Sequence, residues 1–143
     1  MNIKRLKEIM DTLRVSAEYF MQTNGKLLNK IEPEYLNRFK RILVSIDGNR
    51  EKTDFNQGKG TYEKVISNLK YIKENGFIGG IVARITILPS DFPIYLLEQI
   101  EHLFTLNLFD SVHWQLDMGF YKSDFNKEKI SEFVEKYNAE VDS

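Results

Sequence analysis

Polar side chains capable of chemistry lie at or near the ends of short apolar runs. Ser45 and Asp47 end one run, Arg84 lies in the next, and His113 and Asp117 lie in the last. Imidazole and carboxylate groups transfer protons in general acid–base catalysis, and a guanidinium can hold a carboxylate through two hydrogen bonds. These positions predict a polar site that exchanges protons with a ligand or binds a charged one.

The individual residues also admit structural roles. His113 and Asp117 are about 13 Å apart along a strand, so they would each act on a ligand rather than on one another. His113 could equally be satisfied by a neighbouring backbone group. A buried Arg84 requires a partner, and a structural ion pair with Asp47 or Asp117 is favoured over a substrate carboxylate. His102 is expected at the surface.

Composition excludes several classes of site and partner. The chain of 143 residues has no cysteine and two histidines, which excludes disulfides, thiolate catalysis and cysteine-bound metal centres. A net charge of −1 gives no reason to expect nucleic-acid or membrane binding. Apolar runs are strand-sized and the N-terminus has no apolar signal core, so we expect a cytoplasmic protein without a membrane span.

The chain alternates between strand and helix patterns without a linker, which predicts one domain spanning 1–143. Alternation of this kind is typical of a parallel sheet covered by helices, either doubly wound or part of a barrel. The predicted helices are 3–14, 32–40, 61–75 (capped by Thr61), 91–107 and 126–141; the predicted strands are 15–25, 41–48, 79–88 and 109–120; 49–60 is predicted to be a loop.

Each predicted strand has one apolar and one more polar face. A sheet between two helical layers should be apolar on both faces, whereas a barrel lumen is polar toward the carboxyl ends of its strands. We therefore predict an α/β fold: a partial (β/α) TIM-like barrel arc of about four parallel strands with outer helices. The alternative is that these groups merely face solvent at strand ends. The polar faces carry Gln22 and Asn24; Ser45 and Asp47; Arg84 and Thr86; and His113, Gln115 and Asp117.

The glycine-rich stretch NQGKGTYE (56–63) does not match a Walker phosphate-binding loop, because Gly60 follows Lys59 where Ser or Thr is required. A generic anion site at a helix N-terminus remains open. The alternative function is therefore a small α/β binding or regulatory module that holds an anionic ligand or a protein partner with this loop.

Several segments in order resemble the radical S-adenosylmethionine superfamily, in particular its peptide- and protein-modifying branch of anaerobic sulfatase-maturating enzymes. QTNGKLL is similar to a strand that ends in Thr-Asn-Gly, and ILVSIDG to one that ends in Ser-x-Asp-Gly. KGTYEKVISNLKYIKENG is similar to the helix that follows, and ARITI to the next strand. The likeness covers roughly residues 15 to 90.

The resemblance implies a partial barrel that binds S-adenosylmethionine at the carboxyl ends of its strands. Ser45 matches the serine that contacts the cofactor, and Asn24 and Asp47 match adjacent lumen positions. Gln57 stands where an arginine commonly helps to bind the cofactor, and it cannot supply a guanidinium charge. Arg84, His113, Gln115 and Asp117 then face the lumen and the substrate.

The resemblance also implies a 4Fe-4S cluster bound by Cys-x3-Cys-x2-Cys, which this cysteine-free sequence does not contain. We therefore expect an N-terminally truncated relative without metal ligands or activity of its own. The implied reaction is hydrogen abstraction from a peptide or protein substrate. Without the first strands of the family, VSAEYFMQ would form an exposed edge, which predicts a homo-oligomer or a helix that covers the edge.

Overall fold

Four parallel strands form one sheet, flanked by helices. The computed structural model describes residues 2–13, 17–87 and 94–117, together with 131–132, 134–135 and 138–139. The predicted helix 126–141 lies mostly outside these residues. In chain order the elements are α1 (Ile3–Thr12), β1 (Tyr19–Thr23), the 3-10 turn η1 (Leu28–Lys30), α2 (Pro33–Leu36), β2 (Phe39–Ser45), α3 (Arg50–Gln57), α4 (Thr61–Glu74), β3 (Gly80–Ile87), α5 (Ile94–Thr105) and β4 (Ser111–Leu116).

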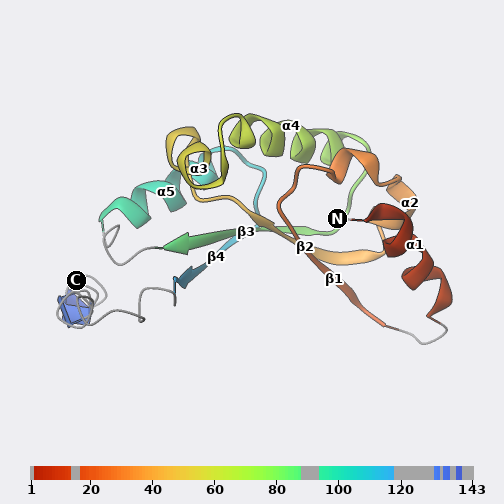
Figure 1. Ribbon diagram of the computed structural model, residues 1–143, viewed down its shortest axis with the longest axis horizontal. Helices are drawn as coiled ribbons and strands as arrows, with labels where there is room; N and C mark the ends of the chain where they lie inside the picture. Colours follow the sequence, from red (N-terminus) through yellow and green to blue (C-terminus); the bar gives the residue numbers. More distant parts are fainter. Residues whose placement is uncertain are drawn as a thin grey trace.

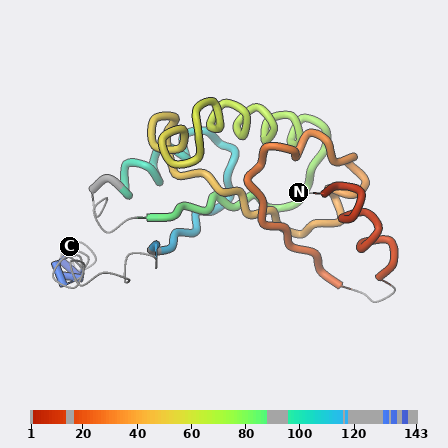
Figure 2. Tube along the Cα trace, in the orientation of Figure 1, coloured from red at the N-terminus to blue at the C-terminus, as the bar shows by residue number. Residues whose placement is uncertain are grey.

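The spatial order of the strands is their order in the chain, β1-β2-β3-β4. Each neighbouring pair is parallel, and Thr23, Val44, Ala83 and Val112 stand at the same level across the sheet. The path of the chain in Figure 2 shows each new strand added beside the previous one. The carboxyl ends of the strands therefore meet at one edge, as the sequence predicted for a parallel sheet.

The core lies on one face of this sheet. Ile42, Val44 and Ile46 have no exposed surface, and they belong to the same buried cluster as Val65 and Leu69 of α4. Each such side chain contributes roughly 1.5–3 kcal/mol through burial. Figure 1 shows α3, α4 and α5 together on one side of the sheet.

Most side chains on the other face are exposed or half-buried, although Val82 is buried there. Gln22 is exposed, and Leu43, Ser45 and Arg84 are half-buried. The predicted division into an apolar face under helices and a more polar face is confirmed for these strands. Among the helices of the described residues, none combines the length and apolar character that a membrane crossing requires.

The predicted loop 49–60 was wrong over most of its length, because Arg50–Gln57 is helical. Its one large apolar side chain, Phe55, is 85% exposed, so the segment has no apolar stripe by which to recognise a helix. A local cap begins the helix instead, since Asn49 Oδ1 accepts the Lys52 N–H at 3.0 Å. The preceding short helix also ends earlier than predicted, because Phe39 and Lys40 already belong to β2.

Thr61 was predicted to cap α4, but it is the first helical residue, and Gly60 occupies the cap position with φ +82°. The Asp54 carboxylate accepts the N–H groups of Gly60 at 2.9 Å and Tyr62 at 2.8 Å. The N–H groups of Tyr62 and Gly60 hold the pKa of Asp54 below its usual value. A side chain of α3 thus caps α4.

A cluster of aromatic and charged side chains holds α1 near the amino ends of β1 and β2. The Arg38 guanidinium lies 5.5 Å from the Tyr19 ring centroid and 5.8 Å from that of Tyr35, and it binds Asp11 at 2.8 Å. The Tyr35 hydroxyl also donates to Asp11 at 2.8 Å. The hydrogen bonds from Tyr35 and Arg38 lower the pKa of Asp11. Met10 of α1 is buried beneath this cluster.

Candidate functional site

A hollow of about 350 Å³ opens at the carboxyl ends of β2, β3 and β4. This volume lies within the range of small-molecule sites, about 300–1,000 Å³. The side chains around it are two carboxylates, two amides and two hydroxyls, with no basic group among them. They belong to Ser45, Asp47, Asn56, Gln57, Thr86 and Asp117.

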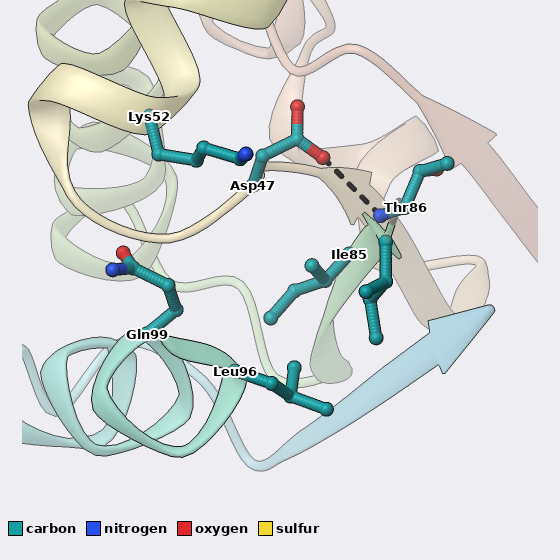
Figure 3. A pocket seen from close by; sticks show the side chains of 7 residues that line it. Asp47, Lys52, Ile85, Thr86, Leu96 and Gln99 are labelled. Atoms are coloured by element: carbon teal, nitrogen blue, oxygen red, sulfur yellow. Dashed lines mark hydrogen bonds between the residues drawn. The ribbon is translucent and has the colours of Figure 1, made fainter. Parts of the chain in front are cut away.

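Asp47 is the most constrained of these residues. It is 6% exposed, and its Oδ1 accepts the Thr86 N–H at 3.2 Å while its Oδ2 accepts the Gln57 side-chain amide at 2.9 Å. Figure 3 shows the carboxylate of Asp47 directed at the backbone of Thr86. Two ionised oxygens offer about four acceptor positions, so this carboxylate keeps capacity for a ligand.

The backbone that carries Asp47 is fixed from α3. Thr53 is fully buried, and its hydroxyl accepts the Asp47 N–H at 3.1 Å and donates to the Gly48 carbonyl at 3.2 Å. Gly48 has φ +118°, a conformation that side chains disfavour. A Cβ atom there would stand 2.1 Å from Gln99 Oε1, which accepts the Asn49 N–H at 2.6 Å. The turn between β2 and α3 is therefore held by α3 and α5 together.

A second cavity of about 10 Å³ lies beside the hollow and shares Asp47 and Thr86 with it. Figure 3 shows Ile85 and Leu96 on its apolar side and the side chain of Lys52 pointing toward Asp47. Its volume is that of about one water molecule. The larger hollow is consequently the place where an organic ligand fits.

The structure brings together four of the eight residues predicted for the site, Ser45, Asp47, Gln57 and Asp117. Asn24 does not line this hollow, and its Oδ1 accepts the Lys26 N–H at 3.2 Å in a local turn. Asn24 was predicted here because its strand end was expected to meet the others.

The remaining predicted residues, Arg84, His113 and Gln115, are not among those that line the hollow, although Arg84 stands level with Ser45 and Gln115 with Thr86. Arg84 donates to Gln115 Oε1 at 2.5 Å, and the carboxylate of Asp47, one of the two ion-pair partners predicted for Arg84, is bound by Gln57 and Thr86 instead. Pairing of Arg84 with Asp117 stays a prediction. His113 is exposed and stands beside Arg84 in the β3–β4 register. Asn56 lines the hollow but was not predicted for the site, since α3 was not recognised. Thr86 also lines it; the sequence placed Thr86 on the polar face without assigning it to the site.

A different group of residues surrounds the start of α4. Tyr62 Oη lies 2.8 Å from His102 Nε2, beside an open hollow of about 720 Å³ lined by both rings and by Arg50 and Asp54. Burial raises the pKa of Tyr62, and the charge of Glu63 adds to this. His102 was predicted to lie at the surface and is half-buried, and its partner forty positions earlier gave no sequence signal.

The N-terminus of α4 is where the alternative anion site was expected. Two of its backbone donors, the N–H groups of Gly60 and Tyr62, bind the protein's own Asp54 carboxylate. An incoming anion would have to displace this carboxylate and would meet its negative charge. The geometry therefore gives no support to the anion site.

Comparison with known proteins gives no assignment. No protein-family model matches the chain, and no curated protein matches it. Within the described residues, no cluster of three histidine, cysteine, aspartate or glutamate side chains is arranged to hold a metal ion.

Proposed function

We propose that this chain forms the ligand-binding wall of a radical S-adenosylmethionine-type partial barrel and that the hollow binds S-adenosylmethionine. One observation carries the proposal: Ser45, Asp47 and Gln57, three of the four residues aligned with cofactor positions by resemblance, line a common hollow at the carboxyl ends of parallel strands. Ligands of parallel barrels bind at this end.

The barrel arc is supported by the order of the strands. Parallel crossovers are right-handed in nearly all proteins, so strands added in one direction place their helices on one face. This chain has the order β1-β2-β3-β4, with α3, α4 and α5 on one side of the sheet (Figure 1). A doubly wound sheet reverses its direction and uses both faces.

The lining residues suit the cofactor's chemistry. S-adenosylmethionine carries a positive sulfonium and an ammonium group, and its adenine amine and ribose hydroxyls donate hydrogen bonds. Asp47 and Asp117 supply carboxylates, and the other lining groups accept hydrogen bonds. None of the described residues that line the hollow is basic, although Lys52 lines the small cavity beside it. The two carboxylates therefore favour a cationic ligand over a nucleotide phosphate.

The iron–sulfur cluster does not fit this chain. Three thiolates hold such a cluster in the family, and the sequence has no cysteine. We therefore derive no radical step from these residues and expect binding without turnover. Modification of a peptide is a property of the family that this polypeptide cannot perform alone.

Calorimetric titration of the full chain tests the proposal. We expect heat of binding with S-adenosylmethionine, and a Ser45→Ala variant should bind at least about tenfold more weakly, the equivalent of about 1.4 kcal/mol. Asn24→Ala is the matched control, since Asn24 lies outside the hollow, and it should bind like the unsubstituted chain. Failure to bind the compound, or tighter binding of adenosine triphosphate, would contradict the proposal.

A further inference from the structure

We propose that a second copy of this chain completes the site, with β4 of each copy pairing in parallel with β1 of the other. This inference goes beyond the proposed function, because it rests on the edges and faces of the sheet and not on the identity of the ligand. Both copies would contribute their polar faces to one lumen.

The two outer strands have complementary edges. β1 is hydrogen-bonded to β2 alone and β4 to β3 alone among the described strands. Their outer edges present N–H and C=O groups that can pair with another strand. Because β1 and β4 run in the same direction, β1 of a second copy can pair with β4 as a further parallel strand of the same sheet.

Two copies supply the strand number that closure requires. A parallel barrel closes with about eight strands, whose interior is just wide enough for side chains to fill it. The four strands of the described residues cannot close on themselves. A two-fold axis along the barrel would create two identical β4–β1 contacts and leave no outer edge, as a closed symmetric dimer requires.

We call the face of the sheet opposite α3, α4 and α5 the uncovered face (Figure 1), and it has the polarity of a barrel interior. Parallel sheets are nearly always covered on both faces, yet Phe20 on this face is 55% exposed. Phe20 and Leu43 lie toward the amino ends, whereas Ser45, Arg84 and Thr86 lie toward the carboxyl ends. In a parallel barrel, packed layers of side chains fill the interior, and the binding site lies at the carboxyl ends of the strands.

The hollow gains its missing wall in this arrangement. It opens on the uncovered face, and a two-fold axis through the lumen brings Asp47 and Asp117 of both copies to the same rim. The dimer would therefore have one shared site, to which both copies contribute Asp47 and Asp117.

Sedimentation of the full chain gives the first test. We expect a species of twice the chain mass of 16.8 kDa that dissociates on dilution. Phe20→Asp should shift it to the monomer. Ile78→Asp is the matched control: Ile78 is 84% exposed in the turn between α4 and β3, so this variant should stay dimeric. A monomer at all concentrations, or dissociation of both variants alike, would overturn the proposal.

Cysteine crosslinking tests the pairing of β1 with β4 of another copy. The chain has no cysteine of its own that could form a competing disulfide. Gln22→Cys protein is mixed with His113→Cys or with Gln115→Cys protein and oxidised. The two β4 positions sample adjacent levels on the uncovered face. A disulfide needs Cα atoms within about 7 Å, so a covalent dimer in a mixture reports β1 beside β4 of another copy.

The control Lys70→Cys, on the exposed surface of α4, should not crosslink with Gln22→Cys. Self-crosslinking of Gln22→Cys alone would indicate β1 paired with β1, and it would overturn the arrangement. A dimer in which neither mixture crosslinks would also overturn it. S-adenosylmethionine binding is measured separately, so the dimer and the ligand proposals fail independently.

Discussion

Asp47 is held by residues from two other elements. Thr86 of β3 binds one carboxylate oxygen, Gln57 of α3 binds the other, and Thr53 of α3 fixes its backbone. The sequence identified Asp47 from its place at a strand end. It could not identify these partners, because a hydrogen bond across six to thirty-nine positions leaves no periodic pattern.

Replacing Thr53 tests this support. Thr53→Val keeps the volume but leaves the buried Asp47 N–H without an acceptor, which should lower the free energy of unfolding by about 1–3 kcal/mol. Thr53→Ser keeps the hydroxyl and loses a methyl group, at about 0.5–1.5 kcal/mol. Hydrogen exchange at the Asp47 amide should accelerate in the valine variant only. Equal protection in both variants would show that the hydroxyl does not hold this turn.

Gly48 provides a second prediction at the residue scale. In Gly48→Ala, strain at φ +118° and displacement of Gln99 from the Asn49 N–H should together cost about 2–4 kcal/mol. Gly60→Ala is the control: Gly60 has φ +82° with no atom near the added methyl group, so about 1–2 kcal/mol is expected. Urea unfolding measures both, and equal losses would argue against the contact with Gln99.

At the scale of elements, helix α3 decides the geometry of the hollow. It was not recognised because Phe55 points outward and no apolar stripe exists, whereas the stripe of α4 made that helix predictable. What holds α3 is its cap at Asn49 and its contacts with the turn after β2 and the start of α4. A strong apolar periodicity arises when a helix buries a whole face. Because α3 buries only Thr53, its sequence has no such periodicity.

The link from α3 to α4 should depend on pH. The lowered pKa of Asp54 means that its carboxylate stabilises the fold fully at pH values above the unfolded value of 3.8. This stabilisation is lost as the pH falls through the lower folded pKa. Asp54→Asn has no titrating carboxyl, so its urea midpoint should be below that of the unsubstituted chain near neutral pH, and the difference should shrink in acid.

Glu51→Gln is the control for this measurement, because Glu51 is exposed on the same helix. Its difference from the unsubstituted chain should stay small at every pH. A pH-independent deficit in Asp54→Asn would mean that the carboxylate contributes by shape and not by charge.

For the whole molecule, alternation and face polarity in the sequence were sufficient to predict the parallel α/β sheet and its covered face. They could not predict what contacts the uncovered face, since polar side chains are compatible with solvent, a ligand or a second copy equally well. The positions of Ser45 and Asp47 followed from strand periodicity. The position of Arg84 on the polar face followed from it as well, but the local turn at Asn24 and the hydrogen-bond partner of Arg84 did not, because turns and partner choice depend on packing between elements.

Adjacent residues of β2 separate the two faces experimentally. Ile42 is fully buried under the helices, so Ile42→Ala should cost about 2–5 kcal/mol at any protein concentration. Leu43 is half-buried on the uncovered face, so Leu43→Ala should cost less than about 1.5 kcal/mol in dilute monomer. If a second copy covers this face, the cost of Leu43→Ala should rise with protein concentration, because association stabilises only the folded chain. Urea unfolding across a hundredfold range of concentration distinguishes these cases, and a constant cost for Leu43→Ala would place that side chain in solvent.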